Sequence, residues 1–218
     1  MIRVWGRSSS SNVQKVLWAL DELRLPFAHE VVGGPLGGLD RPEFVALTPV
    51  GRVPVIDVDG FALWESQAIL RYLARRYGAA LDLGTAEQAA LIDQWLDFSL
   101  TTWQPPVTRV FWQVVRLPAR QRSDAALTAA LAETDAASAI LDARLAESPW
   151  LGGDRFSIAD IGAGLLLYRY FDMDIPRPDR PALLRWYQDL QERPPFRSRV
   201  MTSYEELRAR DDGGSTLK

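Results

Sequence analysis

Apolar and polar positions follow two different patterns along the chain. In residues 1–78, short apolar runs alternate with stretches of helical spacing. The expected strands are Arg3–Gly6, Phe27–Val32, Pro54–Val58 and Phe61–Trp64, with an Asp-Gly hairpin signal between the last two. Helical spacing predicts one helix over Val13–Leu23, ended before Pro26, and another around Ile69–Leu73, closing near Gly78. This order of elements predicts a small α/β domain.

From Thr85 onward the pattern is helical throughout. Thr85 and Gln88 fit a capping box at the start of a long helix, and a Pro-Pro pair at 105–106 is expected to kink or interrupt it. Further helices are expected at Ser123–Ala146, Ile158–Tyr170 and Pro181–Arg193, with a second capping box at Ser157 and Asp160 and a frayed tail from Asp211. We therefore expect an α/β domain over 1–78, a linker over 79–84 and an all-helical domain over 85–218.

The composition narrows the class of protein. With 47% hydrophobic and 24% charged residues among 218, the chain has the make-up of an ordinary globular protein, not of a disordered one. A net charge of -3 gives no electrostatic reason to expect a nucleic-acid partner. The absence of cysteine excludes a disulfide scaffold, a thiolate metal site and chemistry on the protein's own sulfur.

The lengths of the apolar runs indicate whether the chain is expected to enter a membrane. The first residues lack the apolar stretch of a signal peptide. The longest apolar run, near Gly162–Tyr168, is far shorter than the ~20 residues that cross a bilayer. We expect no membrane partner and a cytoplasmic location.

Standard catalytic groups are scarce in this sequence. The one histidine, His29, lies in a strand-like run, where a structural role is favoured over catalysis. With one histidine and no cysteine, a structural zinc site is strongly disfavoured and no metal is expected. The glycine-rich stretch at 33–38 lacks the Gly-Lys-Ser/Thr of a phosphate loop and is interpreted as a surface loop.

Two polar features remain as candidate chemistry. Four serines and Asn12 stand between the first strand and the first helix, and a single N-cap does not require five polar residues. Glu65 and Ser66 begin the next helix, where a hydroxyl and free backbone N–H groups can hold an anion. A plain helix cap explains this second pair equally well.

Four motifs, taken in order, resemble the cytosolic glutathione S-transferase family over nearly the whole chain. They are Ser-x-Asn-x-x-Lys-Val-x-x-x-Leu-x-Glu-Leu from Ser10, Gly-x-Val-Pro-x-Ile from Gly51, Trp-Glu-Ser-x-Ala-Ile-x-x-Tyr-Leu from Trp64, and the capping box Ser157-Ile-Ala-Asp160. The likeness is to bacterial, serine-type members that are theta- or nu-like. It implies a thioredoxin-like α/β domain followed by an all-α domain, assembled as a homodimer.

The resemblance also implies which residues bind glutathione, the co-substrate. Val53, before a cis Pro54, presents its backbone N–H and C=O to the cysteinyl unit. Glu65 and Ser66 hold the γ-glutamyl end, through carboxylate to ammonium and through hydroxyl and helix N-terminus to carboxylate. Arg52 is a counter-charge for a glutathione carboxylate, or else a solvated loop arginine.

The resemblance assigns thiol activation to Ser10, whose hydroxyl donates a hydrogen bond to the glutathione sulfur. Such a bond to a charged group contributes roughly 1.5–3 kcal/mol, enough to lower a thiol pKa by about one to two units. Asn12 is a second candidate donor. A one-residue change of register would put Ser9 or Ser11 in place of Ser10.

The second substrate is expected between the domains, in a small-electrophile pocket near the Pro-Pro pair. The candidate lining residues are Trp103, Arg109, Phe111 and Trp112. Burial in the helical core or in a subunit contact is the alternative for the aromatic three, and Arg109 either faces glutathione or bridges subunits.

Three functions stay open on the sequence. The first is an enzyme that conjugates the glutathione thiolate to an electrophile, as in detoxification. The second is a glutathione-dependent disulfide reductase, which without cysteine needs two glutathione molecules. The third is a non-catalytic relative used in protein interaction, which the intact Ser10, Val53, Pro54, Glu65 and Ser66 disfavour.

Overall fold

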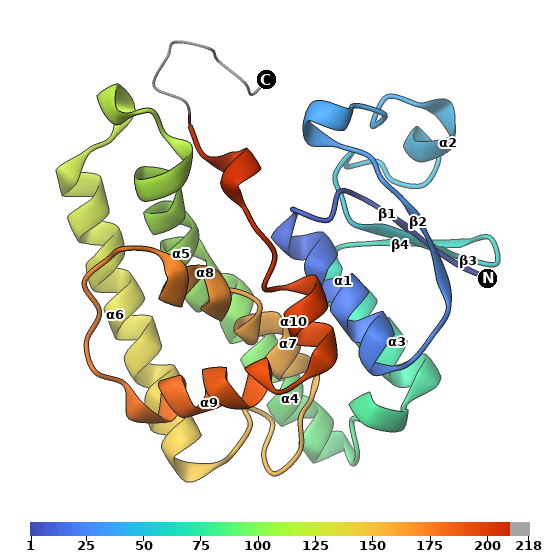
Figure 1. Cartoon of the computed structure of the whole chain (residues 1–218). Helices are drawn as coiled ribbons and strands as arrows, with labels where there is room; N and C mark the ends of the chain where they lie inside the picture. The colour runs from blue at the N-terminus through green and yellow to red at the C-terminus, as the bar shows by residue number, and fades with distance from the viewer. Residues whose placement is uncertain (210–218) are drawn as a thin grey trace.

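In residues 1–209, the part of the chain that this computed structural model describes, four short strands form one mixed sheet (Figure 1). They are β1 (Ile2–Trp5), β2 (Phe27–Glu30), β3 (Val55–Val58) and β4 (Phe61–Trp64), in the spatial order β2-β1-β3-β4. β1 runs parallel to β2 and antiparallel to β3, and β3 pairs with β4 through the expected hairpin. The α/β half of the predicted fold class is confirmed.

The two faces of this sheet are covered by different helices. Because strand side chains alternate between faces, Val4 and Ile56 point into the main core with helices α1 (Ser11–Glu22) and α3 (Ser66–Tyr77). Trp5 and Val55 point the other way, against Phe44 of the short helix α2 (Pro42–Val45). The sequence analysis left α2 within a loop, since one turn carries too little periodicity to be recognised.

The rest of the described chain is helical, as predicted (Figure 1). Its α-helices are α4 (Ala86–Phe98), α5 (Gln104–Phe111), α6 (Asp124–Glu147), α7 (Ile158–Gly164), α8 (Leu167–Asp172), α9 (Pro181–Gln191) and α10 (Pro194–Arg199). Two π-helical segments, η3 (Ser99–Trp103) and η4 (Trp112–Arg116), and 3-10 turns η1 (Gly34–Leu36), η2 (Ala79–Leu81), η5 (Ala119–Gln121) and η6 (Glu205–Leu207) complete it.

The long helix is interrupted near the Pro-Pro pair at 105–106, as predicted. α4 ends at Phe98, a π-helical segment follows, and the prolines lie in the first turn of α5, where a missing N–H is tolerated. One prediction about helix continuity needs correction. The helix expected over Ile158–Tyr170 is split into α7 and α8. Gly162 and Gly164 weaken the end of α7, and Leu166 N–H bonds the carbonyl of Ala163 in a tighter i to i+3 turn.

Both predicted capping boxes are present. Gln88 N–H donates to Thr85 Oγ1 at 3.3 Å while Thr85 N–H donates back to Gln88 Oε1 at 3.0 Å. Asp160, fully buried, accepts from Ser157 N–H at 2.9 Å and from donors outside its own helix as well. The second box therefore ties α7 into the core rather than only ending a helix.

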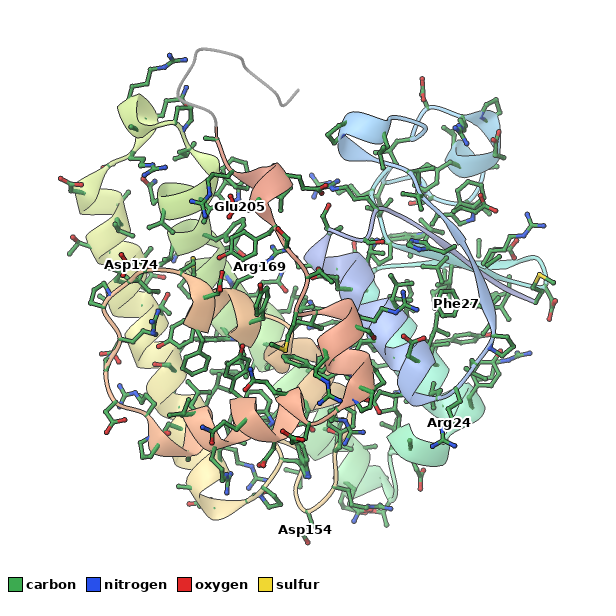
Figure 2. The ribbon with its side chains drawn as sticks, in the orientation of Figure 1. Arg24, Phe27, Asp154, Arg169, Asp174 and Glu205 are labelled. Carbon is green, nitrogen blue, oxygen red and sulfur yellow. The ribbon has the colours of Figure 1, made fainter. Side chains whose placement is uncertain are left out.

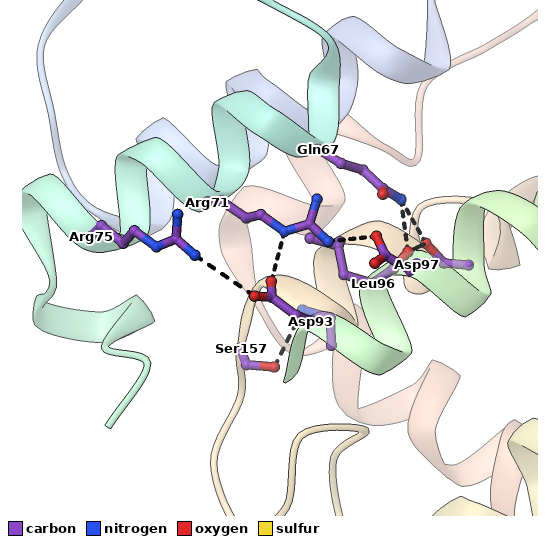
Figure 3. A network of polar contacts seen from close by, with 9 residues as sticks. Gln67, Arg71, Arg75, Asp93, Leu96, Asp97 and Ser157 are labelled. Atoms are coloured by element: carbon purple, nitrogen blue, oxygen red, sulfur yellow. Dashed lines mark hydrogen bonds and ion pairs between the residues drawn. The ribbon is translucent and has the colours of Figure 1, made fainter. Parts of the chain in front are cut away.

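The N-terminal and helical parts are joined where side chains of α3 reach α4 (Figure 3). Gln67 donates from Nε2 to the carbonyl of Leu96 at 2.8 Å and to Ser99 Oγ at 3.1 Å, both buried. Arg71 Nε donates to Asp93 at 2.7 Å, and its Nη2 reaches Asp97. Because Gln67 follows the first residue of α3, these bonds fix the N-terminal turn of that helix.

The segment 79–84, predicted as a linker, contains η2, and its Leu81 and Leu83 are buried in the core. The boundaries of the two domains stay a prediction. The tail expected to fray from Asp211 lies outside the described residues. Of the helices in the described range, none is long and apolar enough to cross a membrane.

Candidate functional site

A small pocket of about 90 Å³ opens at the edge of the sheet where the chain passes from β4 into α3. Its lining residues come from three separate segments: Asn12, Thr48, Val50, Arg52, Val53, Pro54, Trp64, Glu65 and Ser66. Every residue that the resemblance assigned to glutathione binding is among them. Asn12 is there too, whereas Ser10 is not.

The Val53–Pro54 peptide bond is cis, as the resemblance implied. The loop carrying it approaches α1 closely across Gly6, whose φ is 145°. A Cβ at that glycine would lie 2.4 Å from Val13 and 3.0 Å from Val53. Only glycine fits here, and this lets the loop and the start of α1 meet at one pocket.

Glu65 and Ser66 form the junction of β4 and α3. Glu65 has φ 69° and ψ 113°, a conformation that non-glycine residues rarely adopt and that costs of order 1–3 kcal/mol. Ser66, the first residue of α3, is only 5% exposed. The carboxylate and the free N–H groups of the first helical turn therefore lie at the same pocket, a pairing suited to a ligand that carries both an ammonium and a carboxylate.

The side chain of Asn12 is oriented by its neighbours. Lys15 Nζ donates to Asn12 Oδ1 at 3.2 Å and to Gln104 Oε1 of α5 at 2.9 Å. Ser66 Oγ lies 3.5 Å from the same Asn12 oxygen. With its oxygen engaged by two donors, the carboxamide leaves its NH2 group to donate to a ligand.

Lys15 is a buried cation beneath this pocket. It is fully buried, and this desolvation lowers its pKa from 10.5 to about 8, opposed by the attraction of Glu65. At neutral pH the ammonium is therefore charged. Its charge faces the Asn12 carboxamide oxygen, to which it donates, and is attracted by the Glu65 carboxylate.

Ser9 and Ser10 of the serine cluster have different surroundings in the structure. Ser10 is the N-cap of α1, yet its side chain makes no capping hydrogen bond. Ser9 accepts from Arg7 Nε at its Oγ, at 3.2 Å, and its carbonyl accepts from Arg169 Nη2 at 3.0 Å. The hydroxyl of Ser10 therefore stands at the start of a 12-residue helix, beside the pocket rather than within its lining.

Comparison with known proteins identifies the family. A model of the glutathione S-transferase N-terminal domain matches residues 9–76, and one of the C-terminal domain matches residues 124–189. Glutathione S-transferase GstB of Escherichia coli strain K12 is 39% identical over 204 residues, which cover 92% of this chain and 98% of that one. The chain belongs to the glutathione S-transferase family.

A solved structure and a second relative are also similar to this chain. The theta class glutathione S-transferase from Xanthomonas axonopodis pv. citri, solved with glutathione bound, superposes with a TM-score of 0.88 at 42% identity, covering 93% of this chain and 98% of that one. The disulfide-bond oxidoreductase YfcG of Escherichia coli strain K12 is 32% identical over 202 residues, covering 84% of this chain and 87% of its own. The family and the two-part fold predicted from the sequence are both confirmed.

Within this glutathione S-transferase, the four residues expected at the electrophile pocket are dispersed. Trp103 is fully buried in the helical core and donates from Nε1 to the carbonyl of Ala163 at 3.1 Å. Arg109 is paired with Glu133 of α6 in the same chain. Phe111 is buried, and Trp112 is 42% exposed. Of these four, Trp112 alone has a well-exposed ring.

Sequence analysis missed several residues of this pocket. Thr48, Val50 and Trp64 line it, and Lys15 supports it from below. Lys15 was open to recognition, because it follows Asn12 by three residues on one helix face among apolar neighbours. The histidine is structural as interpreted: His29 Nε2 hydrogen-bonds the carbonyl of Gly6 at 2.6 Å.

Proposed function

We propose that this enzyme is a glutathione transferase that binds glutathione in the pocket lined by Asn12, Val53 and Ser66 and adds its thiolate to an electrophile. The observation that carries the proposal is the convergence of three motifs, far apart in sequence, on one pocket above a buried cation. A relative at 42% identity has been solved with glutathione bound, which supports the same ligand here.

The γ-glutamyl end of glutathione is assigned to the start of α3. Its ammonium pairs with the Glu65 carboxylate, and its carboxylate accepts from Ser66 Oγ and the free N–H groups of the first turn. The backbone of Val53 receives the cysteinyl unit. Arg52, exposed at the rim of the pocket, serves as counter-charge for a carboxylate.

The thiolate is assigned to the space between Ser10 and Asn12, at the N-terminus of α1. Ser10 Oγ and Asn12 Nδ2 both donate to the sulfur, and the helix N-terminus favours negative charge there. This lowers the thiol pKa, so that no general base is needed. The bond formed is carbon to sulfur, and the leaving group departs with the electron pair of the bond that breaks.

The test is a titration of glutathione by calorimetry, followed by thiolate ultraviolet absorbance of the complex between pH 5 and pH 10. A bound thiol with a pKa at least one unit below its free value supports the proposal. Binding without a shift in pKa overturns thiol activation. No binding at all favours the third reading, a non-catalytic fold relative.

A disulfide reductase is the second candidate, favoured by the 32% identity to YfcG. Lacking cysteine, this chain would need two glutathione molecules to exchange with the disulfide. Rates with 1-chloro-2,4-dinitrobenzene and with 2-hydroxyethyl disulfide, measured on the same preparation, separate the two activities.

A homodimer and a cytoplasmic role in detoxification are part of the proposal. The dimer is supported by apolar groups left exposed beside α3 and α4. Phe61, 50% exposed, packs against Tyr72 with ring centroids 5.3 Å apart, and Leu91 is 49% exposed. Phe61→Ser is expected to shift the sedimentation coefficient toward the monomer. An unchanged dimer would place the contact elsewhere.

A further inference from the structure

Three arginines converge where the helical part approaches the serine cluster. Arg169 extends from α8 near the C-terminal segment that carries Glu205 (Figure 2) and donates to the carbonyl of Ser9. Arg7, two residues before Ser9, donates from Nε to Ser9 Oγ. Arg116 ends η4, and it is close enough to Arg7 for repulsion between them to add to burial in lowering the pKa of Arg116.

These guanidinium groups have no carboxylate to neutralise them within residues 1–209. By contrast, Arg109, two helical turns before Arg116, forms an ion pair with Glu133. Arg116 Nε is buried without a hydrogen-bond partner. Burial, followed by repulsion from Arg116 and Arg7, lowers the pKa of Arg169 to about 10. Partly buried cations without a counter-charge cost free energy, so the cluster is suited to an anion that residues 1–209 do not supply there.

Aromatic rings form the walls of the same region. Arg116 Cζ lies 4.5 Å above the half-exposed ring of Trp112. Arg169 Cζ lies 4.8 Å from the ring of Phe111 and 5.8 Å from that of Tyr204. Rings under the guanidinium planes leave the guanidinium edges, which carry the N–H donors, to face a ligand.

We propose that Arg7, Arg116 and Arg169 form the recognition site for a carboxylate, or an equivalent anionic group, on the electrophilic substrate. This rests on the proposed transferase function and names its substrate class: an anionic electrophile of aromatic or comparable size. Ser9, bound by two of the arginines, directly precedes Ser10, so the anion is held next to the sulfur position. The thiolate attacks the electrophilic carbon, the carbon–sulfur bond forms, and the halide or other leaving group takes the electrons of the broken bond.

The kinetic test uses two substrates of nearly the same shape, of which one is anionic and one neutral: 4-chloro-3,5-dinitrobenzoate and 4-chloro-3,5-dinitrobenzamide. Each enzymatic rate is divided by the uncatalysed rate of the same substrate, which corrects for their different reactivity. The enzyme is expected to favour the benzoate in kcat/KM. Arg116→Gln is expected to lower the benzoate-to-benzamide ratio about tenfold or more, the worth of a hydrogen bond to a charged group. The ratio should also fall as salt is raised. Arg120→Gln, the same charge change at an exposed position four residues on, is expected to leave the ratio unaltered.

Binding measurements keep the inference separate from the transferase proposal. Calorimetry with the unreactive 3,5-dinitrobenzoate and 3,5-dinitrobenzamide tests the arginines even if neither chloride is turned over. Turnover of the benzamide with no preference for the benzoate in binding or rate overturns this inference alone. Two glutathione molecules bound per chain, with the second lost in Arg116→Gln, would assign the cluster to glutathione instead.

The acidic residues Asp211 and Asp212 follow shortly after Ala209, whose N–H donates to the carbonyl of Val115 at 2.9 Å. The titrations are therefore repeated on the double variant Asp211→Asn/Asp212→Asn. Benzoate binding that is lost in Arg116→Gln, in the unaltered chain or in the double variant, supports the proposed site. If neither protein shows such Arg116-dependent binding, the proposal is overturned.

Discussion

Lys15 Nζ lies 3.2 Å from Asn12 Oδ1, so a fully buried ammonium fixes the orientation of a carboxamide at the proposed glutathione pocket. The same ammonium reaches Gln104 of α5, which ties this pair to the helical part of the molecule. Lys15 touches no part of the pocket lining other than Asn12 among the hydrogen bonds of the described chain. We therefore assign it a positioning role that is exercised through Asn12.

A double-mutant cycle tests this coupling. Asn12→Ala and Lys15→Met are each expected to lower turnover about tenfold, because the first removes the Asn12 donor and the second removes the contact that orients it. The double variant should be no slower than Asn12→Ala, since Lys15 acts through that side chain. Rates with 1-chloro-2,4-dinitrobenzene provide the measurement. If the loss of turnover in the double variant equals the product of the two single losses, Lys15 acts independently of Asn12.

The pKa of Lys15 predicts how stability depends on pH. Below pH 8 the folded and unfolded chains both carry this charge, and the cost of burying it is fully present. Between about pH 8 and 10.5 the folded chain releases the proton while the unfolded chain keeps it, so the contribution of Lys15 to stability rises with pH. The gain over Lys15→Met is on the order of 3 kcal/mol. Urea unfolding of both proteins from pH 7 to pH 10 measures it, and parallel curves would contradict it.

Ser10→Ala is expected to cut turnover at neutral pH about tenfold or more, from the loss of a hydrogen bond to a charged sulfur. Glutathione affinity should change little, and the deficit should shrink at high pH, where the thiol ionises unaided. Ser8→Ala, at an exposed position of the same cluster, is the matched control. Full activity of Ser10→Ala, together with a slow Asn12→Ala, would leave activation to Asn12.

Ser66→Ala and Glu65→Gln are expected to weaken glutathione binding about tenfold each, because each removes one charge-assisted contact to the γ-glutamyl end. The melting temperature should hold, since the backbone of α3 stays anchored through Gln67. Calorimetric titration gives the affinities. An unaltered dissociation constant in both variants would move the ligand out of this pocket.

Asp160→Ala is expected to destabilise the protein by several kcal/mol, more than the ~1 kcal/mol of an ordinary helix cap. The Asp160 carboxylate accepts four hydrogen bonds, from Leu151 N–H, Ser157 N–H, Ser157 Oγ and Trp186 Nε1. Each donor left unsatisfied in the core costs roughly 1–3 kcal/mol. Urea unfolding measures the loss, while activity per folded molecule should be retained. Selective inactivation of a fully stable variant would contradict a structural role.

Local signals were enough to predict most of the fold. The capping boxes at Thr85 and Ser157 and the hairpin after Val58 depend on hydrogen bonds between residues two to four positions apart, so their residues carry the information themselves. The break after Gly164 and the short helix α2 were missed, because each is set by a single turn against neighbouring packing. The order and spacing of the four motifs likewise predicted the family and the candidate residues that line the pocket.

What the sequence alone determined was therefore the family and the two-part architecture, together with a short set of candidate binding residues. The tertiary structure decided which of them meet. Lys15 reaches Gln104 across 89 positions, Arg169 reaches Ser9 across 160, and Trp103 turns into the core instead of toward a substrate. Such contacts follow from how whole helices pack, because the facing of a side chain depends on the burial of surfaces that no local pattern specifies.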